Sequence, residues 1–155
     1  MKDLARCLGE YPAELLYAIA DVWGLDRPDL DERDGILALA TGMSDEDALA
    51  RIVDRLSPEG RRLLADIQLA GGSVPSGRVT MAHGTIRRLG PARMAREMPW
   101  TKPENPLEEL YYRGLLHRAY GQIGRHYGEI YFLPQQVFDA SVEVRIEGRR
   151  RQHEV

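Results

Sequence analysis

The stretch from Asn105 to Pro134 constrains the fold of this chain more than any other part of the sequence. Asn105 is a favoured helix N-cap, Pro106 fits the first helical position, and Glu108 stands where its carboxylate could reach back to the cap amide. We expect the helix to end before Gly114, because glycine readily adopts the left-handed conformation that closes a helix. A short, well-delimited helix is therefore predicted here.

An alternation of apolar and polar residues follows this helix and predicts strands. It covers 115–120 and then 129–133. The intervening residues, 121–128, contain several glycines and are predicted to form a loop. We expect the two strands to pair as an antiparallel hairpin, with His117 on the first strand and His126 in the loop.

Apolar residues spaced three and four apart predict further helices upstream. The expected ranges are 11–24, 32–43 with Asp31 as cap, 44–56 with Ser44 as cap, 57–70 with Ser57 as cap, and 76–83. Residues 73–75 are expected to be extended, because the residue before a proline avoids the helical region. After the hairpin we predict a short helix over 135–140 and a strand over 141–146, followed by a basic tail.

The first two of these helices form an N-terminal helical hairpin over 1–43, joined through Trp23, Gly24 and Leu25. In length and apolar pattern the pair resembles helix-extended-helix DNA-binding modules of the SAP type. Such modules carry basic residues at the start of the second helix. Here carboxylates dominate 29–34 and would repel phosphates. The alternative is that the hairpin packs on the rest of the chain or on a partner.

From Ser57 onward the predicted order is helix, extended segment, helix, helix and hairpin, which resembles a winged helix-turn-helix domain. The motifs G-G-x-V-P at 71–75 and P-x-E-x-L-Y-Y-R-G-L-L at 106–116 also resemble winged-helix regions found beside bacterial helicase-like proteins. That resemblance implies an accessory nucleic-acid-binding or regulatory module without the motor. The predicted fold class is mainly α with a small antiparallel β-hairpin. It has a winged-helix core over 44–140, and a strand and basic tail over 141–155.

Charge is distributed unevenly along the chain, although the net charge is only −3. Residues up to Pro75 carry 8 Lys and Arg against 15 Asp and Glu, whereas the remainder carry 13 against 9. A basic half can attract nucleic-acid phosphates, or the two halves can simply be two solvated surfaces. Arginines concentrate in 84–104, an insertion that a minimal winged helix does not need. Within it, 91–98 is predicted as a short helix.

Nucleic-acid contact is predicted from the cations of the insertion and the hairpin. The last helix is expected to expose Glu108 and Glu109 beside Tyr112, and carboxylates are poor partners for DNA. We expect phosphate contact with modest sequence preference. The predicted nucleic-acid-binding residues are Arg87, Arg88, Arg93, Arg96, Lys102, Arg113, Arg118 and Arg125.

An alternative leaves the arginines paired with the acidic N-terminal helices of the same chain. The module would then bind a protein partner and no DNA. Its contact surface would be either the acidic hairpin or the region of Trp100 and Tyr112.

The sequence lacks the signatures of catalysis and of metal binding. Its histidines and its single cysteine, Cys7, do not occur at the spacing of a structural zinc site, and its glycine-containing segments lack the context of a phosphate loop. We predict no enzymatic activity, no metal and no cofactor. No apolar run approaches the ~20 residues of a membrane span. The N-terminus has no signal-peptide core, so a cytoplasmic location is expected.

Overall fold

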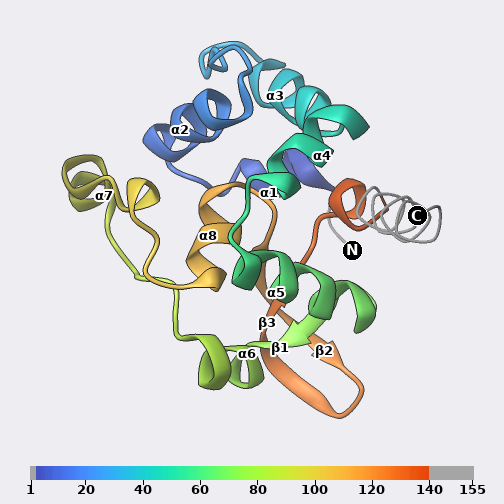
Figure 1. The fold of residues 1–155 in the computed structure, drawn as a ribbon. Coiled ribbons are helices and arrows are strands. Elements are labelled where there is room, and N and C mark those ends of the chain that lie inside the picture. Colours follow the sequence, from blue (N-terminus) through green and yellow to red (C-terminus); the bar gives the residue numbers. More distant parts are fainter. Residues whose placement is uncertain (1–2, 140–155) are drawn as a thin grey trace.

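Helices make up most of the described chain, and its strands form one small antiparallel sheet (Figure 1). The structure is a computed structural model that describes residues 3–139. In chain order the elements are α1 (Leu4–Leu8), α2 (Ala13–Trp23), α3 (Gly35–Met43), α4 (Glu46–Asp54), α5 (Pro58–Leu69), β1 (Ser73–Pro75), α6 (Ser76–His83), α7 (Pro91–Glu97), the 3-10 helix η1 (Pro99–Thr101), α8 (Pro106–Tyr112), β2 (His117–Ile123) and β3 (His126–Phe132). Residues 135–139 are helical as well. The predicted strand and basic tail of 141–155 lie outside the described residues.

The expectation of a mainly α fold with a small antiparallel hairpin is confirmed. The predicted extended segment over 73–75 is β1, which pairs with β3 and makes the sheet three-stranded in the order β1-β3-β2. α1 has no counterpart among the predicted helices, because its five residues are too few to show a helical period.

Capping residues and glycines mark the helix ends where the sequence predicts them. The Ser57 hydroxyl accepts a hydrogen bond from the Gly60 N–H (3.0 Å) at the start of α5. The Asn105 side chain accepts one from the Glu108 N–H (2.9 Å) at the start of α8. α2 ends at Gly24, whose φ of 69° lies in the left-handed region.

Two helix starts differ from the prediction. α3 begins at Gly35, after the predicted cap Asp31, because Asp29 Oδ1 accepts a hydrogen bond from the Asp31 N–H (3.0 Å) and holds this segment in a turn. α4 is capped by Asp45 rather than by Ser44. The Ser44 hydroxyl instead donates to a carbonyl oxygen of α3, so this residue belongs to the end of the preceding helix.

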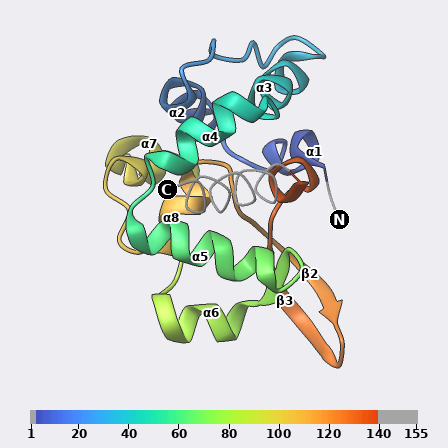
Figure 2. The same cartoon turned by 45° about the vertical axis from the view of Figure 1, so that its right-hand side comes forward.

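β2 and β3 form a tighter hairpin than predicted. The predicted loop over 121–128 is wrong, since its ends continue the ladder and Gly121 lies opposite Gly128. Gly124 and Arg125 alone make the turn, and Gly124 has a φ of 57°. Such two-residue turns need a residue that tolerates positive φ, which is why glycine occurs here. The hairpin projects away from the helices in both ribbon views (Figures 1 and 2).

The helices pack around α8 in one continuous hydrophobic core that includes α1 to α4. The Tyr11 hydroxyl donates to the carbonyl oxygens of Tyr111 (3.0 Å) and Leu116 (3.1 Å). Trp23 Nε1 donates to the carbonyl oxygen of Arg113 (2.9 Å) at the end of α8. The N-terminal helices therefore share their core with the rest of the described chain.

Candidate functional site

α8 does not present the exposed face expected of it. The side chain of Glu108 is 0% exposed and that of Tyr112 is 2% exposed, so both lie in the protein interior. Arg113, just after the helix, is half-buried. The prediction that this helix exposes Glu108 and Tyr112 is therefore wrong, and Tyr112 is not available as a partner contact. α8 is a core helix, enclosed by α5, α6 and the N-terminal helices.

Glu108 is the centre of a hydrogen-bond network that joins α8 to the insertion. Its carboxylate accepts hydrogen bonds from the backbone N–H of Arg87 (2.7 Å) and from two nitrogens of the Arg87 guanidinium (3.0 Å each). The Glu104 N–H (2.9 Å) and the Tyr112 hydroxyl (3.4 Å) complete the set. The predicted bond to the amide of Asn105 is thus replaced by a bond to the preceding amide.

The charge of Glu108 is stabilised by these donors. Burial alone would raise the pKa of Glu108, but the hydrogen bonds from Arg87 and Glu104 outweigh it and hold the pKa below its ordinary value. Burial of the Tyr112 hydroxyl, together with the neighbouring Glu108 carboxylate, raises the pKa of that hydroxyl. The carboxylate is therefore ionised inside the protein, where it cannot face DNA.

Glu109 is half-buried and is also held by hydrogen bonds within the fold. Its carboxylate accepts hydrogen bonds from the Ser57 hydroxyl (2.9 Å) and the Ser57 N–H (3.3 Å), which ties α8 to the start of α5. Gly60 lies directly against this carboxylate, where any Cβ would collide with Glu109 Oε1. The two acids that made α8 an unsuitable DNA-binding helix in sequence are both structural.

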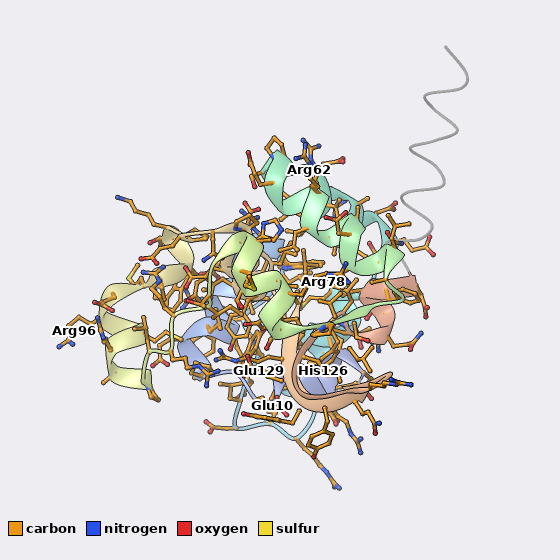
Figure 3. All side chains as sticks on the ribbon, turned by 90° about the horizontal axis from the view of Figure 1, so that it is seen from below. Glu10, Arg62, Arg78, Arg96, His126 and Glu129 are labelled. Carbon is orange, nitrogen blue, oxygen red and sulfur yellow. The ribbon has the colours of Figure 1, made fainter. Side chains whose placement is uncertain are left out.

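Three insertion arginines are held in ion pairs. Their partners are Glu108 for Arg87 (3.0 Å), Glu129 for Arg88 (2.8 Å) and Glu97 for Arg93 (2.9 Å). These partners lie on α8, β3 and α7, not on the acidic N-terminal helices. Arg96 and Lys102 are exposed and have no ion pair within residues 3–139. Figure 3 shows Arg96 at the outer end of α7, pointing away from the body. The insertion therefore does not form one continuous cationic patch.

The hairpin displays two exposed aromatic rings. Tyr120 and Tyr127 are each 78% exposed. Tyr120 lies opposite Glu129 and Tyr127 lies opposite Gln122, and residues that are opposite or two apart in a ladder share a face. Arg118 lies on the same face by this alternation. We call Arg118, Tyr120, Gln122, Tyr127 and Glu129 the tyrosine face.

The single acid of the tyrosine face is neutralised from the insertion. Arg88 Nη2 lies 2.8 Å from Glu129 Oε2, and the Glu129 side chain is only 20% exposed whereas that of Arg88 is 72% exposed. Figure 3 shows Glu129 on the side of the hairpin that faces α7. Arg125 is exposed at the turn and has no ion pair within residues 3–139. Because the Arg88–Glu129 pair is neutral, the remaining charge of the hairpin is positive.

Arg118 marks the base of the tyrosine face. Its guanidinium lies 5.2 Å from the ring centroid of Tyr111, at cation–π distance. It also lines a surface pocket of about 350 Å³, beside Leu89 and Met94 of the insertion. Of the predicted site residues, the structure brings Arg88, Arg118 and Arg125 to the hairpin. The others lie elsewhere on the insertion or at the end of α8.

Tyr120 and Tyr127 are absent from the residues predicted from sequence. The alternation of side chains along the two strands could have indicated these residues, since it puts every second residue on one face. The predicted loop covered Tyr127, however, and the pairing of both rings on one face follows only from the two-residue turn.

No protein-family model, curated protein or solved structure matches this chain. Within residues 3–139, no three or more His, Cys, Asp or Glu side chains gather as a metal site would need. No helix in that part of the chain is long and apolar enough to cross a membrane.

Proposed function

We propose that this chain is a non-enzymatic winged-helix module that binds DNA through the tyrosine face of its hairpin. The order α5, β1, α6, α8, β2, β3 and the sheet order β1-β3-β2 support the winged-helix assignment. The observation that carries the binding proposal is the position of Tyr120 and Tyr127. These exposed rings lie between Arg118 and Arg125 on a projecting hairpin.

The chemistry of this face suits a nucleic acid. Guanidinium groups bind phosphate oxygens in a forked geometry, and tyrosine rings stack on bases with little sequence preference. Direct readout in the major groove ordinarily needs polar side chains on an exposed helix or ribbon. Because α8 is buried, contact should depend on phosphates and rings and should discriminate weakly between sequences.

Binding is expected to be salt-dependent and to need Arg125. With two or three phosphate contacts, raising the salt from about 50 to about 200 mM should weaken binding by roughly 10-fold. Arg125→Glu should weaken it by a further factor of about 10, because it reverses a charge at the turn. Fluorescence anisotropy of a labelled oligonucleotide measures both effects.

Arg62→Glu is the matched control. Arg62 is exposed on α5, has no ion pair within residues 3–139, and lies away from the hairpin in Figure 3. The same change of charge there should leave affinity nearly unaltered. The absence of binding at low salt would contradict the proposal, and so would equal losses for both variants.

Arg88 is expected to assist binding indirectly, by cancelling the charge of Glu129. Arg88→Ala should lower affinity about fivefold, because it leaves a carboxylate uncovered beside the phosphates. Adding Glu129→Gln should restore affinity in the double variant, and the same anisotropy titration tests this. If Arg88 itself contacted phosphate, the double variant would still bind more weakly than the natural chain.

A protein partner is the second candidate. The loop between α2 and α3 exposes the carboxylates of Asp26, Asp29, Asp31, Glu32 and Asp34. This loop favours contact with a basic protein surface. No oligonucleotide binding at low salt, together with an intact fold, would leave this candidate alone.

A further inference from the structure

We propose that the tyrosine face binds single-stranded DNA rather than duplex DNA, with bases stacked on Tyr120 and Tyr127. This inference rests on the proposed function and names its ligand class. It follows from the exposure, spacing and surroundings of the two rings.

The two rings lie apart from the other aromatic side chains of residues 3–139. Each is 78% exposed, and neither makes a ring contact with another aromatic side chain within residues 3–139. Both lie on one face, on neighbouring strands and displaced by two residues along the ladder. The Cα atoms of such diagonal neighbours are about 7–8 Å apart. Their ring faces are therefore separately available to two bases.

A duplex cannot use rings arranged in this way. Its bases are stacked at about 3.4 Å along each strand, so an intact double helix exposes base edges and hides base faces. A single strand can turn its bases outward, and every base has a face on which an aromatic ring can stack. Two solvent-exposed tyrosine rings can therefore stack on the base faces that a single strand leaves free.

The other residues of the tyrosine face suit contact with the backbone of a single DNA strand. Arg118 lies at the base of the hairpin and Arg125 at its turn, so the two rings lie between two cations. Gln122 Nε2 donates to the Gly124 carbonyl oxygen (3.2 Å), and the amide oxygen of Gln122 can accept a hydrogen bond from a base. Glu129, the only acid on the face, is covered by Arg88 at 2.8 Å. A DNA strand that lies along the hairpin would thus meet no uncompensated negative charge on this face.

The test compares a labelled oligothymidylate of about 15 nucleotides with a duplex of the same length, by anisotropy at low salt. The single strand should bind at least about 10-fold more tightly than the duplex. Tyr120→Ala and Tyr127→Ala should each lower single-strand affinity by about 10-fold. Tyr120→Phe and Tyr127→Phe keep the stacking ring and should bind nearly as the natural chain does.

Leucine at either position separates ring stacking from hairpin stability, since it keeps an apolar side chain without an aromatic face. Unchanged thermal unfolding shows that each variant retains the fold. Duplex binding as tight as single-strand binding would overturn this inference and leave the proposed function standing. Alanine variants that bind as the natural chain does would also overturn it. Absence of binding to either oligonucleotide would overturn both.

Discussion

Replacement of Glu108 with alanine is expected to lower the free energy of unfolding by about 3–5 kcal/mol, the usual loss when one partner of a buried ion pair is removed. The carboxylate is 0% exposed and accepts hydrogen bonds from the Arg87 backbone, the Arg87 guanidinium and the Glu104 N–H. Alanine removes the acceptor of the two backbone N–H groups and of Arg87 Nε, while Arg87 Nη2 keeps the Lys102 carbonyl oxygen (3.1 Å). Chemical denaturation monitored by circular dichroism measures the loss.

Glu104→Ala is the control for this prediction. The Glu104 side chain is 62% exposed and lies 3.5 Å from Arg87, so its removal should change stability by no more than about 0.5 kcal/mol. The backbone N–H of Glu104 that donates to Glu108 is unaffected by this substitution. Similar losses for the two variants would contradict the role assigned to Glu108.

The same carboxylate should contribute to acid unfolding. Its pKa is lower in the folded than in the unfolded chain, so its contribution is present above the unfolded pKa and is lost as the pH falls through the folded value. The free energy of unfolding should therefore fall as the pH drops below about 5. The fall should be smaller in Glu108→Ala, because that variant lacks the group. Parallel pH profiles would contradict this.

Gly114→Ala is expected to cost about 2–4 kcal/mol of stability, through two separate effects. Gly114 has a φ of 77°, and a side chain in this left-handed region is strained. A Cβ would also lie 2.8 Å from Met43 Cε and 3.6 Å from Ile19 Cδ1, side chains of α3 and α2. The substitution thus pushes the N-terminal helices away from the junction of α8 and β2. Thermal or chemical unfolding measures the effect.

Gly24→Ala separates the two effects. Gly24 also follows a helix with a left-handed φ, of 69°, but a Cβ there would meet nothing within 4 Å. Its cost should be the backbone strain alone, about 1–2 kcal/mol. The excess loss in Gly114→Ala reports the contact with Met43. Equal losses would mean that the N-terminal helices do not pack against this junction.

Local signals in the sequence predicted the elements well where a single residue controls the outcome. Ser57 and Asn105 cap α5 and α8 as expected, and Gly24 ends α2. These results depend on hydrogen bonds and backbone conformations within a few residues, which the sequence contains directly. Prediction from sequence fails where the hydrogen-bond or ion-pair partner of a residue is distant in the chain.

The site residues illustrate that limit. Glu108 and Glu109 are indistinguishable in sequence from solvent-facing acids, yet their partners are Arg87 and Ser57, 21 and 52 residues away. Pairings over such separations are tertiary, and charge patterns along the chain do not contain them. The predicted loop over 121–128 likewise left the tyrosine face unpredicted. Strand register depends on the length of the turn, and the two-residue turn was not expected.

The most direct test of binding at the tyrosine face is to map the binding site by nuclear magnetic resonance, adding a single-stranded oligonucleotide to isotope-labelled protein. If the tyrosine face binds the single strand, the amide signals that shift will be those of the hairpin over 117–132 and of Arg88, with α8 and the α2–α3 loop unchanged. Shifts centred on α5 and α6 or on the N-terminal helices, with none in the hairpin, would contradict it.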